Sequence, residues 1–201
     1  MSVALWLTAA VGGTSILAKY SLSPGIAGSP SSIWPVESRL ARDAASAHLV
    51  MVVHPHCPCS RASIGELATL MAGEQKRLRA SVIFVEPPGF AGSWAKTDLW
   101  NDAGLIPGVT RVIDDGREAR LFNAATSGQT MVYDARGNLL FTGGITNARG
   151  HFGDNDGIRS IAMIINDGAP AKDAAVTRTP VYGCALFESV RGSGSKTSCP
   201  R

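Results

Sequence analysis

Two cysteines separated by a single proline stand out in the segment His54-Pro55-His56-Cys57-Pro58-Cys59-Ser60. The apolar run 48–53 before them is typical of a buried strand, and residues 60–71 after them have the pattern of a helix. A cysteine at a strand-to-helix junction meets the free N–H groups and positive dipole end of the helix, which favour thiolate over thiol. The pattern therefore predicts an exposed, reactive sulfur at Cys57 that serves redox chemistry or metal binding.

The redox interpretation needs no cofactor. Cys57 attacks a disulfide or a peroxide, and either Cys59 or the distant Cys184 resolves the intermediate. A protonated His56 beside Cys57 would lower the pKa of that thiol, so the predicted catalytic residues are Cys57, Cys59 and His56. A disulfide within Cys-x-Cys closes a very small, strained ring, which suits an oxidant or isomerase better than a strong reductant.

The metal interpretation uses the same sulfurs. Two thiolates are good ligands for a soft metal such as copper(I) or zinc, with His54, His56, His151 or Cys184 completing the site beside Cys57 and Cys59. Cys184 lies in the only apolar stretch of the tail, so we expect that stretch to pack back on the domain; a disulfide with Cys199 is the alternative. A third interpretation, inert buried thiols, fits poorly with an exposed helix start.

Composition limits the function classes. A chain of 201 residues with 45% apolar and 17% charged residues can bury one ordinary core with an appended segment. The net charge is only +3, and no cluster of lysine and arginine interleaves with aromatic residues, which argues against nucleic-acid binding. Four cysteines are too few for a disulfide scaffold and suit a site better.

The N-terminal region differs from the rest of the chain. Residues 2–18 carry no charge, and Lys19 and Tyr20 follow where a membrane interface would place a cation and an aromatic ring. We therefore predict a membrane anchor or signal helix at 1–20, with a buried helix as the alternative. The predicted organisation continues with a linker at 21–33, a domain at 34–166 and an irregular tail at 167–201.

Short apolar strands alternate with helical stretches in the predicted domain, which indicates an α/β fold. A hairpin is expected where two strands flank the short loop Ala135-Arg136-Gly137. The predicted strands are 48–53, 81–85, 110–114, 129–134 and 138–142, and the predicted helices are 37–47, 60–71, 93–103, 117–123 and 156–165.

This order of elements resembles that of a thioredoxin-like domain. Segments 111–119 and 127–137 resemble the TlpA/ResA branch of membrane-anchored thioredoxins, while the Cys-Pro-Cys-Ser motif and segment 143–151 more closely resemble RedB-like proteins. The resemblance implies a three-layer sandwich around a mixed sheet at the cell membrane, facing the periplasm. It also implies thiol–disulfide exchange with protein thiols or disulfides, or with a membrane redox partner.

Two positions depart from the family pattern. Thioredoxins carry Cys-x-x-Cys, whereas Ser60 occupies the place of the second cysteine here. Gln129 stands where the family has a cis-proline facing the active sulfur, and a non-proline residue there is expected to have a trans peptide bond. We therefore expect a different loop beside the cysteines, with room that favours the metal alternative.

Overall fold

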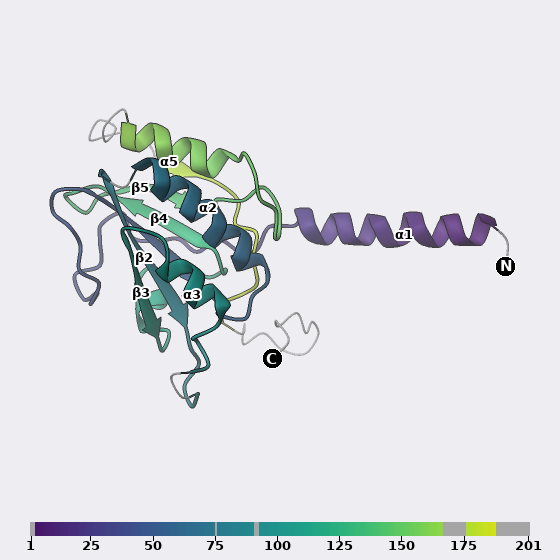
Figure 1. Ribbon diagram of the computed structural model, residues 1–201, viewed down its shortest axis with the longest axis horizontal. Helices are drawn as coiled ribbons and strands as arrows, with labels where there is room; N and C mark the ends of the chain where they lie inside the picture. Colours follow the sequence, from purple (N-terminus) through teal and green to yellow (C-terminus); the bar gives the residue numbers. More distant parts are fainter. Residues whose placement is uncertain (1–2, 75, 91–92, 167–175, 188–201) are drawn as a thin grey trace.

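A mixed six-stranded sheet forms the centre of the computed structural model, which describes residues 3–74, 76–90, 93–166 and 176–187 (Figure 1). The strand order is β3-β2-β1-β4-β5-β6, in which β1, β2 and β3 run parallel and β4 is antiparallel to both β1 and β5. The strands are β1 Ala47–Val53, β2 Leu78–Val85, β3 Val109–Asp114, β4 Gln129–Tyr133, β5 Leu139–Gly143 and β6 Thr177–Arg178. The helices are α1 Val3–Leu22, α2 Cys59–Glu74, α3 Asp98–Gly104, α4 Arg117–Leu121 and α5 Asp156–Asn166.

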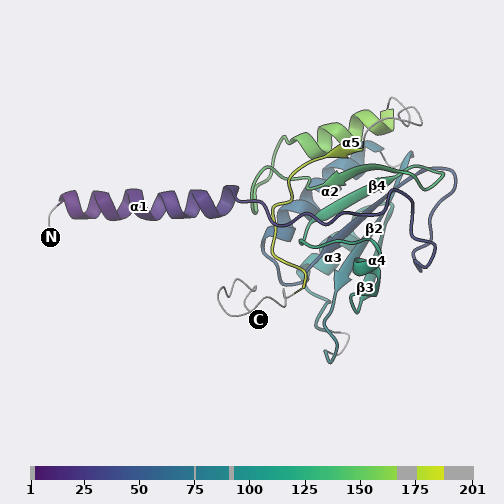
Figure 2. The same ribbon diagram turned by 180° about the vertical axis from the view of Figure 1, so that it is seen from behind.

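The side chains of β1 point alternately to the two faces of the sheet, and a hydrophobic core on each face holds the layers together. Leu49, Met51 and Val53 point to one face, where α2, α3 and α5 cover them. Val50 and Val52 point to the other face, which carries α4 and the chain that leads into β1 (Figure 2). The predicted three-layer α/β sandwich with a mixed central sheet is confirmed, and the two strands predicted around Gly137 form the antiparallel pair β4–β5.

The predicted helix at 37–47 is wrong, because side chains and distant residues take the backbone groups that a helix would need. Residues 37–46 are irregular, with a turn at 37 and bends at 40 and 44–46. The Glu118 carboxylate accepts the Arg39 N–H and the Ser38 hydroxyl, and the Asp43 carboxylate accepts the Ala45 N–H. Local bonds of this kind compete with helix formation.

The helix predicted over 93–103 is shorter and later than expected. Residues 93–95 form a turn, and α3 begins at Asp98. The Glu86 carboxylate accepts the Ala95 N–H, which fixes this turn against the end of β2. The loop that leads into α3 consequently lies beside the cysteine segment, where Thr97 donates its hydroxyl to the Pro55 carbonyl.

Helix α1 extends away from the sheet and has no buried residue (Figure 1). Its 20 residues are long and apolar enough to cross a membrane, as the predicted anchor or signal requires. Segment 23–33, which follows α1 and covers most of the predicted linker, contacts the rest of the chain: Gly25 donates its N–H to Val181, and Leu139 donates its N–H to Ser32.

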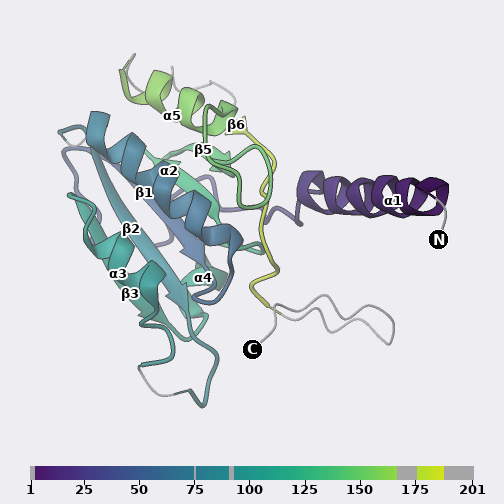
Figure 3. The ribbon, with the colours of Figure 1, turned by 45° about the vertical axis from the view of Figure 1, so that its right-hand side comes forward.

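Part of the predicted tail is ordered along the sheet. Strand β6 pairs in parallel with β5, and the Gly144 N–H donates to the Pro180 carbonyl just beyond it. From there the chain runs past the amino end of α2 (Figure 3). We call residues 179–187 the strap.

Candidate functional site: three clustered thiols

Cys57 lies in the turn that joins β1 to α2. Its N–H donates to the His54 carbonyl at 3.0 Å, and its own carbonyl accepts the Ser60 N–H at 3.0 Å. The helix begins at Cys59, so both cysteines lie at the amino end of α2, as predicted. The predicted exposure is wrong, however, because Cys57 is 0% exposed and Cys59 only 7% exposed.

The strap brings a third sulfur to this end of α2. The Sγ atoms of Cys57 and Cys184 lie 3.2 Å apart. All three sulfurs, including that of Cys59, lie within 4.8 Å of one another. The apolar stretch around Cys184 thus packs back on the domain as expected, whereas Cys199 lies outside the described residues. Cys57 is buried beside other sulfurs, which sets it apart from a thiol sealed in an apolar core.

Backbone pairing holds the strap in place. The Ser127 N–H donates to the Cys184 carbonyl at 2.8 Å, and the Leu186 N–H donates to the Ala125 carbonyl at 2.9 Å. Between these two bonds, Thr126 and Ala185 form an antiparallel bridge. The position of the Cys184 sulfur is therefore fixed by main-chain hydrogen bonds to the loop before β4.

Hydrogen bonding within the cluster separates the pKa values of the thiols. Hydrogen bonds to Cys184 and Cys59 lower the pKa of Cys57 far below its usual value and outweigh the effect of burial. The bonds to Cys184 and Cys57, together with burial, raise the pKa of Cys59. One negative charge can therefore settle on Cys57, with neighbouring thiols as hydrogen-bond donors to it.

The two histidines of the motif occupy different environments. The exposed His56 packs against Trp94 at a tilt, with ring centroids 4.5 Å apart and a ring nitrogen 3.0 Å from the Trp94 carbonyl. His54 is half-buried, and burial lowers its pKa while the nearby charge of Cys57 opposes that effect. The imidazole that responds to the charge of Cys57 is thus that of His54, whereas the sequence analysis had selected His56.

His151 is exposed and is not one of the gathered donor residues. Its N–H donates to the Ala148 carbonyl within a turn. The predicted metal set is therefore brought together only in part: Cys57, Cys59 and Cys184 meet, and His151 does not join them.

Two buried polar residues, Ser127 in the loop before β4 and Gln129 at the start of β4, make contacts that the sequence analysis did not predict. The Ser127 hydroxyl accepts the His54 N–H at 2.7 Å and lies 2.7 Å from the Ser60 hydroxyl, which ties this loop to the cysteine turn. Gln129 is 0% exposed, and its side-chain oxygen accepts the N–H groups of Gly28 and Ala125. The room expected beside the sulfurs is filled by the strap.

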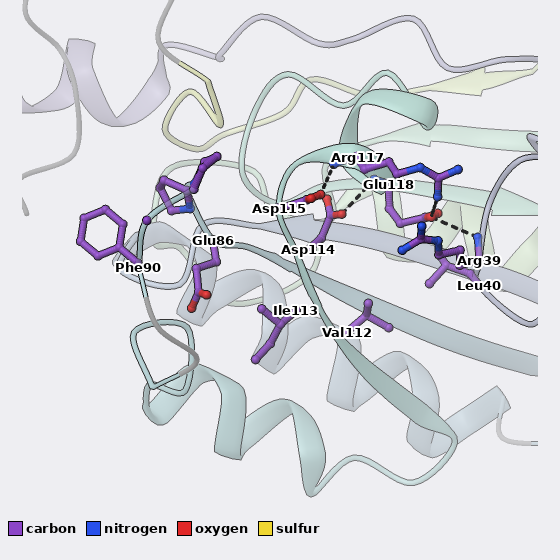
Figure 4. A pocket seen from close by; sticks show the side chains of 13 residues that line it. Arg39, Leu40, Glu86, Phe90, Val112, Ile113, Asp114, Asp115, Arg117 and Glu118 are labelled. Atoms are coloured by element: carbon purple, nitrogen blue, oxygen red, sulfur yellow. Dashed lines mark hydrogen bonds and ion pairs between the residues drawn. The ribbon is translucent and has the colours of Figure 1, made fainter.

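The described residues form two notable cavities. One of about 430 Å³ lies at the ends of β2 and β3, and its carboxylates are already bonded: Asp114 accepts backbone N–H groups of α4, and Glu118 accepts the Arg39 N–H (Figure 4). It therefore offers little for chemistry. The other, of about 250 Å³, adjoins the cysteine turn and is lined by Pro55, His56, Cys57, Pro58, Arg61, Thr97, Asp98 and Leu99.

Comparison with known proteins bears on the fold. No protein-family model matches the sequence, and no curated protein matches it. A conserved uncharacterised protein from Geobacillus kaustophilus is 16% identical, with a TM-score of 0.57 over 85% of this chain and 95% of its own. A hypothetical protein from Sinorhizobium meliloti 1021 is 18% identical, with a TM-score of 0.58 over 83% and 94%. The thioredoxin domain of a thiol-disulfide oxidoreductase from Bacteroides vulgatus is 13% identical, with a TM-score of 0.47 over 73% and 100%.

The strand order, the antiparallel β4 and the cysteine turn between β1 and α2 agree with the predicted architecture. The fold is thioredoxin-like. Its sheet carries β3 beside β2 at one edge and β6 beside β5 at the other. This arrangement places the cysteine turn, the loop before β4 and the strap at one end of the sheet.

Proposed function

We propose that this protein is a thiol–disulfide oxidoreductase in which Cys57 is the nucleophile and Cys184 is the thiol that closes the internal disulfide. The observation that carries the proposal is the 3.2 Å separation of these two sulfurs on a thioredoxin-like fold. Cys59 serves as a hydrogen-bond donor to the Cys57 thiolate, since its own pKa is raised. His54, rather than the sequence-predicted His56, then acts as the nearby imidazole.

The exchange needs only a partner disulfide. The Cys57 thiolate attacks one partner sulfur, a mixed disulfide forms, and the other partner sulfur leaves as a thiolate that takes up a proton. Cys184 then loses its proton and attacks the Cys57 sulfur, which releases the second partner sulfur. Two electrons pass from the Cys57–Cys184 pair to the partner, and the reverse sequence oxidises a partner dithiol.

We further infer that the domain works outside the cytoplasm, held at the membrane by α1, as a TlpA/ResA-type or RedB-like protein. Helix α1 supports this inference by its length, its apolar composition and its lack of buried residues. An internal disulfide couple suits an oxidising compartment, where its partners would be protein thiols or a membrane redox protein.

The test is to equilibrate the full chain in detergent with mixtures of reduced and oxidised glutathione, trap the thiols and map the disulfides by mass spectrometry. We expect a Cys57–Cys184 disulfide that Cys57→Ser and Cys184→Ser both abolish. Cys199→Ser is the control and also tests the Cys184–Cys199 pairing. A disulfide between Cys184 and Cys199, with Cys57 unchanged throughout, would refute the proposal.

A soft-metal site is the second candidate, favoured by the three sulfurs within 4.8 Å of one another. A metal–sulfur distance of about 2.3 Å places three sulfurs around one ion about 4 Å apart, so the cluster could close on copper(I) or zinc with small movements. Metal analysis after purification without chelators distinguishes the two functions. One equivalent per chain, lost in each of Cys57→Ser, Cys59→Ser and Cys184→Ser, would favour the metal carrier.

A further inference from the structure

The strap lies on the loop before β4 in the manner of an extended peptide ligand. Its main chain pairs antiparallel with Ala125–Ser127, and that pairing carries the sulfur of Cys184 to the sulfur of Cys57. A β-strand added to such an edge obtains its affinity from main-chain bonds and its specificity from alternate side chains. The strap thus shows which kind of peptide segment fits beside Cys57, the proposed nucleophile.

Close contacts around Cys184 define which peptide segments fit the groove beneath the strap, where the strap meets the loop before β4. A Cβ atom on Gly183 would lie 1.9 Å from the Ser127 carbonyl oxygen, so the residue before the cysteine must be glycine. The Arg149 guanidinium donates to the Gly183 carbonyl. On either side of this pair, Val181 is 1% exposed and Leu186 is 7% exposed. The groove therefore selects a segment of six residues. Its first and last residues are apolar, its third is glycine and its fourth is cysteine, whereas the second and fifth can be any residue.

The closed arrangement keeps external sulfurs away from Cys57. With the strap in place both motif cysteines are buried, so a protein disulfide cannot approach the Cys57 sulfur in line. The surface under the strap includes polar groups, those of Thr126, Ser127 and the backbone of Gly144, which water can solvate when the strap leaves. The main-chain groups of Ala125 and Ser127 then become available to another extended segment.

We propose that the groove beneath the strap is the binding site for the protein substrate, and that the strap is its internal occupant. The substrate is an extended segment with a Gly-Cys pair flanked by apolar residues, and it displaces the strap to bring its cysteine to Cys57. After the mixed disulfide has formed, the strap returns to the groove, and Cys184 attacks the Cys57 sulfur and releases the substrate. This inference rests on the exchange function proposed above, and it names the class of substrate on which that function acts.

Gly183→Ala tests the groove directly, because its added methyl group expels the strap. In the full chain in detergent we expect alkylation of Cys57, measured by peptide mapping, to accelerate by about tenfold or more, because Cys57 becomes accessible. Gly73→Ala is the matched control, since a Cβ there has no atom within 4 Å. If Gly183→Ala fails to fold, as judged by circular dichroism, the wild-type chain provides the test: excess Val-Tyr-Gly-Ser-Ala-Leu peptide takes the place of the strap, so it must accelerate alkylation of Cys184.

The substrate class is tested with two activated peptide disulfides, Val-Tyr-Gly-Cys-Ala-Leu and Val-Tyr-Ala-Cys-Ala-Leu, each carrying thionitrobenzoate on its cysteine. We expect the glycine peptide to form a mixed disulfide with Cys57 about tenfold faster or more. Equal rates for the two peptides, with ready reaction of 2,2′-dithiodipyridine, would overturn the groove and leave the exchange function standing. No reaction of Cys57 with any of these disulfides would overturn the exchange function itself.

Discussion

Cys57 and Cys184 place their sulfur atoms 3.2 Å apart although 127 positions separate them in the chain. The contact depends on main-chain pairing between the strap and the loop before β4, which does not require a bond between the sulfurs. The geometry for attack is therefore present before any disulfide forms, which is the preorganisation that thiol–disulfide exchange needs.

Cys59→Ala should make Cys57 less reactive at low pH. The Cys59 thiol helps to lower the pKa of Cys57, so its loss raises that pKa and shifts the alkylation profile of Cys57 to higher pH. We expect the midpoint of that profile to rise by about one pH unit, the effect of losing one hydrogen bond to a charged group. Peptide mapping after timed alkylation measures it, with Cys199→Ala as the control. An unchanged profile would mean that Cys184 alone sets the pKa.

His48 should make the protein lose stability in mild acid. Burial lowers the pKa of His48 from 6.5 to about 4, against an opposing attraction from Asp43. Its ring packs on Trp34 and bonds to the Ser81 hydroxyl, and its Nδ1 has no partner among the described residues. The folded state therefore binds the proton less well than the unfolded state, so stability is complete above pH 6.5 and falls as the pH drops towards 4.

The expected loss in the free energy of unfolding at pH 4 is about 3 kcal/mol, from 1.36 kcal/mol per pKa unit. Urea unfolding of the full chain in detergent between pH 7 and pH 4 measures it. His48→Gln should flatten this part of the profile, whereas His151→Gln, at an exposed position, should leave it unchanged. A wild-type profile that is already flat would show that His48 does not control it.

Local patterns were enough to predict most elements of the sheet. The apolar run 48–53 and the loop at Gly137 each carry their signal within a few residues, and β1 and the β4–β5 hairpin form where they were expected. The helix predicted at 37–47 does not form, because the carboxylate of Glu118, about 80 positions away, accepts hydrogen bonds from the Ser38 hydroxyl and the Arg39 N–H. A local stretch of sequence around residues 37–47 cannot reveal hydrogen bonds to a residue so far away in the chain.

The three clustered cysteines are among the residues that the sequence analysis selected, whereas the burial of Cys57 and Cys59 was not predicted. The apolar stretch around Cys184 indicated that the tail returns to the domain, and it does. The burial of Cys57 depends on the segments that pack around its turn, the strap among them, so a motif considered alone could not reveal it. The roles of His54 and His56 depend on Trp94, which binds one ring nitrogen of His56. Sequence alternation could place the two histidines on opposite sides without showing which side held the sulfur.

Gln129→Leu should destabilise the protein and release the segment before β1. The side chain of Gln129 is buried and accepts the N–H groups of Gly28 and Ala125, and leucine leaves both donors unsatisfied. Each buried unsatisfied group costs about 1–3 kcal/mol, so we expect a loss of about 2–5 kcal/mol in urea unfolding. Limited proteolysis should cut residues 23–33 faster in the variant. Wild-type stability would show that Gly28 finds other partners.

Ser127→Ala should disturb the cysteine turn more than it disturbs the fold. The Ser127 hydroxyl is buried, accepts the His54 N–H and lies 2.7 Å from the Ser60 hydroxyl, so alanine leaves the amino end of α2 less firmly held. We expect a loss of about 2 kcal/mol in the free energy of unfolding and faster alkylation of Cys57, because the turn opens more often.

The matched control for Ser127→Ala is Ser160→Ala, at a half-buried position on α5. Thermal unfolding and peptide mapping after timed alkylation are measured on both variants in the same detergent. Faster alkylation in Ser127→Ala alone is the expected result. If the two variants lose similar stability and alkylate at the wild-type rate, the Ser127 hydroxyl does not position the nucleophile, and the backbone bond from Ser127 to Cys184 is sufficient to hold the site.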